Sequence, residues 1–155
     1  MTGHAPTASR SLVVRVQSGV CAVPLIHVLE TMRPVPIEPI AGVPPFVRGV
    51  SIIRGVLTPV VDLGAILGMP DGVAERFVTL RLGDRQVALS VGEVLGVREL
   101  QASRIQELPP LLRGASPDVV ATLSTLDEEV LTVLQAGWEL PDDVWQALAA
   151  QEVAS

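Results

Sequence analysis

The chain has 155 residues, 48% of them hydrophobic, and its 17 acidic and 11 basic side chains give a net charge of −6. That length suits one domain or two small fused subdomains. An acidic chain with two Phe, two Trp and no Tyr lacks the basic stripe and the stacking platforms of nucleic-acid binders, so we expect no nucleic-acid partner. No stretch approaches the roughly 18 uninterrupted apolar residues of a membrane span, and the start of the chain lacks the apolar core of a secretory signal. We therefore expect a cytoplasmic protein that does not insert into the membrane.

Two parts of the chain look like copies of each other. Leu12–Val16 aligns with Val78–Leu82 at an offset of 78 − 12 = 66 positions, and Ile53–Val61 resembles Asp127–Leu134 further along. Self-similarity on this scale sets the architecture of a fold. The repeated unit is long enough to form a small β-subdomain, so the sequence predicts two similar β-barrels in one chain. Two barrels favour a protein with two binding faces over one with a single catalytic cleft.

Residues 1–10 are small and polar, and we expect them to be flexible. The first repeat follows at about 11–70. Its β-branched runs between turn signals predict strands at Leu12–Val16, Val20–Val23, Phe46–Ile53 and Val56–Leu63. Leu25–Met32 is a short apolar segment that could be either strand or helix, and the prolines of Pro34–Pro39 force extended backbone. Pro59 predicts an edge position or a bulge for its strand.

The second repeat spans about 76–137. Its predicted strands are Phe77–Leu82, Gln86–Val91, Val94–Leu100, Val119–Leu126 and Val130–Leu134. Residues 101–117 contain two adjacent prolines and are expected to form a long connection. A helix is predicted at Pro141–Ala150, because proline suits the first helical position and two aspartates complement the helix dipole, and a flexible tail is expected at 151–155. These elements predict paired β-barrels in a single domain at 11–150, with short peripheral helices.

The most specific motif spans residues 45–63 and reads PFVRGVSIIRGVLTPVVDL. It resembles the core of the CheW family, the coupling proteins of bacterial chemotaxis, whose pattern there is roughly apolar-(K/R)-G-V-x-N-L-R-G-x-x-x-P-V-(I/V)-D-L. The spacing matches without a gap. Shorter family-like segments occur in order at Val28–Glu30, Val91–Val97 and Ser124–Leu126, so the resemblance covers nearly the whole chain.

The resemblance implies both a fold and a function. The implied fold is mainly β, with two intertwined five-stranded barrels of SH3 or OB type, exchanged strands, short peripheral helices and a C-terminal helix. The implied function is that of a non-enzymatic scaffold in chemotaxis or related chemosensory signalling. Such a scaffold couples the cytoplasmic tip of methyl-accepting chemoreceptors to the regulatory domain of a CheA-type histidine kinase, in the cytoplasm beneath membrane receptor arrays.

Six positions that match the family become candidate protein-interaction residues: Arg54, Glu30, Gly49, Val28, Val94 and Val97. Arg54 occupies the place of the motif's arginine, and Glu30 stands where the family's glutamate pairs with it. Each also has a plainer interpretation. Arg54 could be an ordinary exposed turn arginine, Glu30 a solvated carboxylate, Gly49 a backbone requirement, and the three valines simple core residues.

Three departures from the family pattern alter polar positions. Ile52 stands where the family has Asn, Gly64 follows the V-D-L segment where Arg is frequent, and Gly92 replaces a common Asp. These changes leave the barrels intact but alter the polar surface that a partner would meet. The sequence leaves open whether they change the choice of partner.

No catalytic, cofactor or metal site is predicted. His4, His27 and Cys21 have no metal-ligand spacing, and Asp62 suits an N-cap better than a catalytic acid. An enzyme using Asp62, Glu30 or His27 has no spacing that implies a shared site. The remaining alternative is an OB-like double barrel that binds a small ligand or single-stranded nucleic acid.

Overall fold

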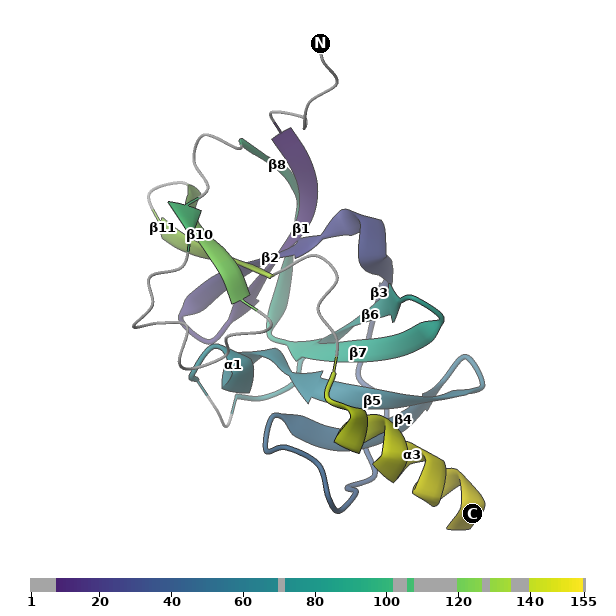
Figure 1. The fold of residues 1–155 in the computed structure, drawn as a ribbon. Coiled ribbons are helices and arrows are strands. Elements are labelled where there is room, and N and C mark those ends of the chain that lie inside the picture. Colours follow the sequence, from purple (N-terminus) through teal and green to yellow (C-terminus); the bar gives the residue numbers. More distant parts are fainter. Residues whose placement is uncertain are drawn as a thin grey trace.

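The structure is a computed structural model that describes residues 8–69, 72–101, 106–107, 120–126, 129–134 and 140–154. Residues 1–7, most of the connection predicted at 101–117 and the tip of the last hairpin lie outside the described residues. Strands dominate the described part of the chain, and they form two sheets (Figure 1).

The first sheet has six strands in the order β8-β1-β2-β11-β10-β9. Their bounds are β1 Ala8–Val16, β2 Gly19–Pro24, β8 Glu93–Gln101, β9 Gln106–Glu107, β10 Val120–Leu126 and β11 Glu129–Leu134. The second sheet has five strands in the order β3-β6-β7-β5-β4. Their bounds are β3 Val28–Met32, β4 Val47–Ile53, β5 Val56–Asp62, β6 Arg76–Leu82 and β7 Arg85–Val91. The described helices are the 3-10 helix η1 Leu25–His27, α1 Leu63–Ile66 and α3 Asp142–Ala154.

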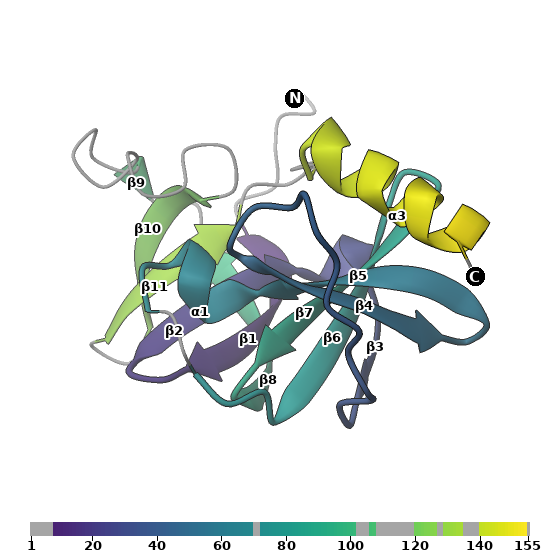
Figure 2. The same ribbon diagram turned by 90° about the horizontal axis from the view of Figure 1, so that it is seen from below.

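The two repeats exchange strands between the sheets (Figure 2). The β1–β2 hairpin of the first repeat pairs with β8 on one side and, in parallel, with β11 on the other. The β6–β7 hairpin of the second repeat pairs in the same way with β3 and, in parallel, with β5. Each sheet is therefore a hairpin of one repeat enclosed by strands of the other. The expected mainly β fold of two intertwined subdomains is confirmed.

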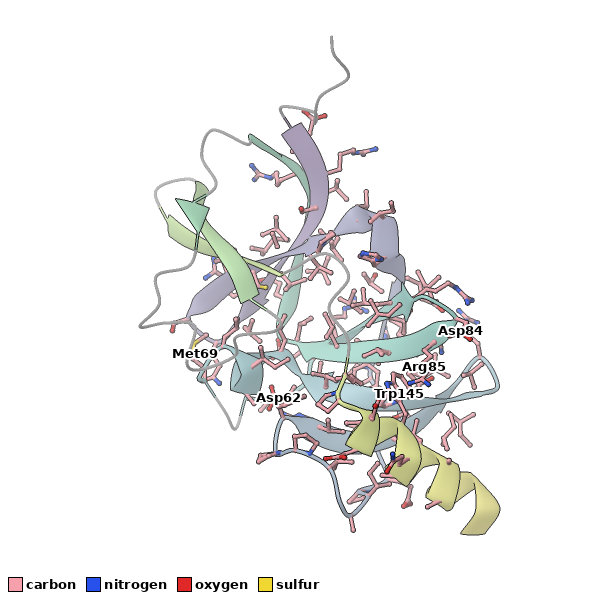
Figure 3. All side chains as sticks on the ribbon, in the orientation of Figure 1. Asp62, Met69, Asp84, Arg85 and Trp145 are labelled. Carbon is pink, nitrogen blue, oxygen red and sulfur yellow. The ribbon has the colours of Figure 1, made fainter. Side chains whose placement is uncertain are left out.

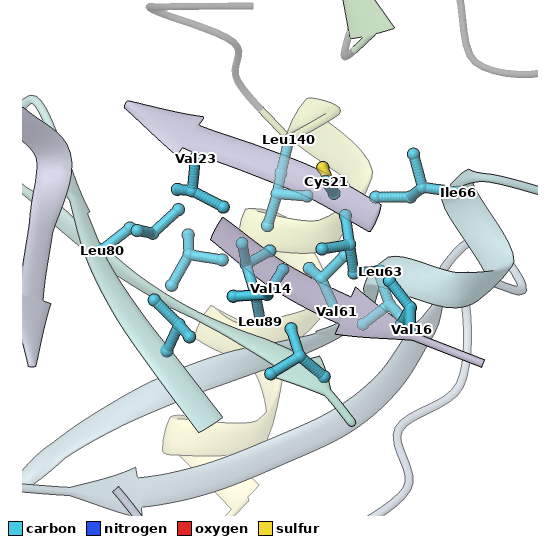
Figure 4. Close-up of a cluster of buried hydrophobic side chains, with 14 of the residues drawn as sticks. Val14, Val16, Cys21, Val23, Val61, Leu63, Ile66, Leu80, Leu89 and Leu140 are labelled. Atoms are coloured by element: carbon cyan, nitrogen blue, oxygen red, sulfur yellow. The ribbon is translucent and has the colours of Figure 1, made fainter. Parts of the chain in front are cut away.

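Both sheets contribute to one buried cluster of aliphatic side chains. It contains Val14 and Val23 from the first sheet and Leu80 and Leu89 from the second (Figure 4). Alternate residues of the second sheet point to its other face, where a smaller cluster forms around Phe77. Because one core serves both sheets, neither sheet can shift without disturbing the packing of the other.

Helix α3 covers part of the second sheet. Figure 2 shows it lying along β5, and Leu140, Val144 and Leu148 are buried in the main cluster. Trp145, one helical position further round, packs against the same cluster. The expectation that Trp145 and Leu148 share the packing face is therefore confirmed.

Of the two positions predicted for Pro59, the edge is wrong, because β5 is an interior strand. The β4–β5 ladder does contain a bulge, but its extra residue belongs to β4, between Val47 and Gly49. Pro59 faces Val50 in the β4–β5 ladder. Val50 exchanges its backbone hydrogen bonds with Glu38 on the far side, so Val50 and Pro59 form a pair without mutual hydrogen bonds. The parallel ladder to β7 starts only at Val60. The missing N–H of proline thus removes no bond from the β4–β5 ladder.

Two elements run further than the sequence predicts. β1 begins at Ala8, because Ala8–Arg10 pair with the end of β8. Helix α3 continues to Ala154, since the residues after Ala150 are mostly good helix formers. The segment of uncertain type at Leu25–Met32 splits into η1 and β3.

Among the described residues, no helix has the length and apolar character needed to cross a membrane.

Candidate functional site

Arg54 lies at the tip of the β4–β5 hairpin. Ile53 pairs with Val56, which leaves a two-residue turn of Arg54 and Gly55. Both have positive φ, 53° and 76°, as a type I′ turn requires. Gly55 adopts this backbone freely, whereas Arg54 is one of few non-glycine residues held there. The turn projects the Arg54 side chain, which is 73% exposed.

The Arg54 guanidinium donates two hydrogen bonds to the carboxylate of Glu30. Nε donates to Oε2 at 3.0 Å, and Nη2 donates to Oε1 at 2.7 Å. This fork geometry holds both groups in a fixed orientation. The hydrogen bond from Arg54 lowers the pKa of Glu30 below its ordinary value, and the same bond raises the pKa of Arg54. The expected pairing of these two residues is confirmed.

The pair joins two strands at opposite ends of the second sheet. Glu30 belongs to β3, the first strand in the sheet order, and Arg54 follows β4, the last. A register shift between Val28 and Glu30 bulges β3 at this point, and the Thr79 hydroxyl donates to the Glu30 carbonyl oxygen at 3.3 Å. The bulge aims the carboxylate of Glu30 at the hairpin tip.

Gly49 is buried and meets a backbone constraint. Its φ is 148°, and a Cβ there would overlap the carbonyl oxygen of Glu38 and crowd Ile37. Glu38 and Val50 exchange two backbone hydrogen bonds, at 2.7 and 2.8 Å. Gly49 therefore lets the segment before β4 approach the strand, and it reaches no partner directly.

The three candidate valines lie on the equivalent end strands β3 and β8 of the two sheets. Val28 and Val94 are half-buried and pack against the main core. Val97 is 42% exposed, beside Leu95 at 40%. Val97 therefore has the most exposed side chain of the three candidate valines. Val28 lies two residues from Glu30, whereas Val94 and Val97 belong to the other sheet.

Sequence reasoning missed an ion pair between Arg48 and Asp62. Nη2 of Arg48 donates to Oδ2 of Asp62 at 3.1 Å and to the carbonyl oxygen of Gly72. Asp62 also accepts from the Ala65 backbone N–H at 3.2 Å, so the predicted N-cap is confirmed (Figure 3). The hairpin register contains the missed signal. Val47 pairs with Val61 in an antiparallel ladder, so Arg48 and Asp62 are diagonal neighbours at a separation that a long arginine side chain can span.

A second missed contact attaches helix α3 to the β6–β7 hairpin. The Arg85 guanidinium lies over the Trp145 ring at 4.4 Å from its centroid (Figure 3). An arginine over an indole face is attracted by the ring quadrupole. The two residues are sixty positions apart, and no local pattern brings them together.

Three of the side chains that could take part in chemistry, Cys21, Asp62 and Glu30, are buried or already hydrogen-bonded. Burial strongly raises the pKa of the Cys21 thiol, which disfavours a thiolate. Asp62 is engaged by the cap and by Arg48, and Glu30 is engaged by Arg54. Among the described residues, no three His, Cys, Asp or Glu side chains gather closely enough to hold a metal.

The family model of the CheW-like domain matches residues 10–137. The chain is 28% identical over 118 residues to a protein of Klebsiella aerogenes named Chemotaxis protein CheW, and the match covers 74% of this chain and 66% of that relative. It thus spans just under two thirds of the relative's length.

The fold also matches a solved structure, the crystal structure of scaffolding protein TtCheW from Thermoanaerobacter tengcongensis. The TM-score is 0.71 at 20% sequence identity, and the match covers 85% of this chain and 97% of that one. Because the family model spans most of the chain and includes the hairpin that carries Arg54, this protein belongs to the CheW-like domain family.

Proposed function

We propose that this protein is a non-enzymatic adaptor in chemotaxis or a related chemosensory pathway. It couples the cytoplasmic tip of a chemoreceptor to the regulatory domain of a CheA-type histidine kinase. Family membership supports an adaptor role, as do the words "chemotaxis" and "scaffolding" in the names of the two similar proteins. The observation that carries the proposal is the Arg54–Glu30 fork, a preorganised charged pair on an exposed hairpin tip.

The work of such an adaptor is geometric. Two sheets that share one buried cluster hold their outer surfaces at a fixed spacing. A partner bound to one surface raises the effective concentration of a partner bound to the other. No bond is made or broken in this role.

Arg54 is the anchor we assign to a partner interface. A guanidinium has five N–H donors, and Glu30 engages only Nε and Nη2. The remaining donors belong to a side chain that is 73% exposed and that Glu30 already orients, which reduces the entropy lost when a partner carboxylate or carbonyl binds. Arginine is also enriched among the residues that dominate interface energetics.

The test is Arg54→Ala, with Arg10→Ala as the matched control on an exposed arginine of the other sheet. Binding to the purified kinase regulatory domain and to the receptor tip is measured by calorimetry. We expect Arg54→Ala to weaken one or both affinities by about tenfold or more, Arg10→Ala to bind normally, and both variants to melt like the wild type. Unchanged binding by Arg54→Ala would remove Arg54 from the interface. Wild-type protein that binds neither partner would overturn the proposal itself.

A further inference from the structure

The outer edge of β4 is only partly covered. The segment between β3 and β4 runs beside it and makes one isolated bridge, in which Glu38 and Val50 exchange N–H···O bonds. These bonds show that the backbone of Val50 points away from β5. Backbone direction alternates along a strand, so the N–H and C=O of Ile52 also point to this outer edge.

Proline stops the cover from reaching Ile52. In an antiparallel continuation of the bridge, the residue opposite Ile52 would be Pro36, which has no N–H to donate. The Pro36 carbonyl instead accepts from the Ser51 hydroxyl at 2.7 Å. In the described part of the chain, the outward N–H and C=O of Ile52 have no hydrogen-bond partner. An edge of this kind is a template for another strand.

An apolar groove runs over this same edge. Its volume is about 410 Å³, and its apolar lining comes from Val35, Pro36, Val50, Ile52 and Leu57. Ile52 lines the groove together with its cross-strand partner Leu57, and its side chain is 71% exposed. Exposure of an apolar side chain to water is unfavourable. Burial of Ile52 under a bound partner would therefore contribute favourably to the binding free energy.

We propose that this groove binds an extended peptide segment of a partner protein, which adds as a strand to β4 at Ile52. The segment carries small or β-branched apolar side chains toward the groove and a lysine or arginine toward Glu38. This site is separate from the Arg54–Glu30 pair and does not depend on the adaptor role proposed above.

Backbone and charge together specify this occupant. The N–H and C=O of Ile52 need an acceptor and a donor at strand spacing, which an extended polypeptide supplies and a packed helix does not. Glu38 borders the groove with an exposed carboxylate and has no ion pair among the described residues. A basic residue complements that carboxylate and the net charge of −6.

The probe is a pool of short synthetic peptides that alternate Val or Ile with Thr and contain one Lys, followed by fluorescence anisotropy. Two matched pools serve as controls, one with alternate backbone amides N-methylated and one with Glu in place of Lys. The protein variants are Ile52→Asn and Ile26→Asn. Ile26 is 87% exposed on η1 and lies outside the groove, so the same substitution is made at a site that should not matter.

We expect the Lys pool to bind the wild type, N-methylation to abolish binding, and Ile52→Asn to weaken it by about tenfold while Ile26→Asn has no effect. The Glu pool should bind more weakly, by a margin that shrinks as salt is raised. The amide of Ile52 should also gain hydrogen-exchange protection when peptide is added.

Three results would overturn the proposal. The first is the absence of binding at millimolar peptide, and the second is binding that Ile52→Asn leaves intact. The third is a wild-type dimer that Ile52→Asn dissociates, because the occupant of the edge would then be a second copy of this chain. None of these results bears on Arg54, so the adaptor proposal would stand or fall separately.

Discussion

Among single residues, Arg54 combines a left-handed backbone conformation with an ion pair to Glu30 that is made through two hydrogen bonds. Arg54 holds a left-handed φ of 53° that a glycine would adopt more easily. The side chain nevertheless suits this position, because from the hairpin tip it reaches the carboxylate of Glu30 on β3 with both Nε and Nη2. At an exposed site the ion pair adds little to the stability of the fold, so its main effect is to fix the orientation of the Arg54 side chain.

The pKa of Glu30 gives a direct check of the pair in solution. Because the hydrogen bond from Arg54 lowers that pKa, the pair contributes stability above the ordinary pKa of a glutamate and loses it as pH falls through the lowered value. A carbon-detected NMR titration should find the Glu30 carboxyl below its ordinary pKa. In Arg54→Ala the pKa should return toward the ordinary value. Identical titration curves in the two proteins would mean that the fork does not form.

The close approach of the Glu38 backbone to Gly49 can be tested by substitution. Gly49→Ala forces a Cβ against the Glu38 carbonyl, so the segment before β4 must move, and we expect a loss of about 2–4 kcal/mol of unfolding free energy. Gly42→Ala is the control, because Gly42 has a φ of 81° and nothing within 4 Å of its Cβ position. It should cost only about 1–2 kcal/mol, from backbone strain alone. Equal losses in urea denaturation would show that the close approach at Gly49 is unimportant.

The motif and the register account for which of these contacts could be predicted. The Arg54–Glu30 pair followed from the family motif, since both residues stand at matching positions. The Arg48–Asp62 pair did not, because it requires the hairpin register, and the bulge between Val47 and Gly49 changes which residues are neighbours. The open edge at Ile52 depends on the path of a proline-rich segment, which composition alone does not fix.

At the scale of elements, α3 acts as a cover for the core. Its buried residues Val144 and Leu148 complete a cluster that the strands leave partly open. The guanidinium of Arg85, on the β6–β7 hairpin, packs over the ring of Trp145 and so also attaches the helix to the sheet. The sequence predicted this helix from Pro141 and the aspartates that follow, but not the surface that it covers, because that surface comes from residues far away in the chain.

Leu148→Ala tests the covering role of α3. Leu148 is 4% exposed, and removing its side chain should lower the free energy of unfolding by about 2–5 kcal/mol. Gln146→Ala, on the exposed side of the same helix, should change it by less than about 0.5 kcal/mol. Thermal and urea denaturation of both variants measure the difference. A small effect of Leu148→Ala would indicate that α3 does not pack on the core in solution.

Strand positions were predictable to within a few residues, because β-branched runs and turn residues mark them. The interior placement of β5 was not, since Pro59 usually signals an edge. Here the proline faces Val50 at a position where the β4–β5 ladder needs no N–H from it. The interior position of β5 results from its pairing with both β4 and β7, which the local sequence around Pro59 does not indicate.

Across the molecule, the exchange of strands joins the two pseudo-repeats into a single rigid unit. The hairpin of each repeat lies inside a sheet built mostly from the other, and one cluster fills the space between the sheets. The repeat at an offset of 66 positions predicted two subdomains. It did not distinguish exchange from independent barrels, because both arrangements pair the same kinds of strand. The exchange came from the family resemblance.

The proposed adaptor role requires that this rigid body bridge two partners. The most direct measurement is co-sedimentation of a CheA-type kinase with assembled receptor signalling tips, with and without this protein. We predict that the wild-type protein increases the amount of kinase in the pellet in a dose-dependent manner, and that Arg54→Ala does so poorly while remaining folded. Kinase recovery that is the same with and without the wild-type protein would contradict the proposed adaptor role.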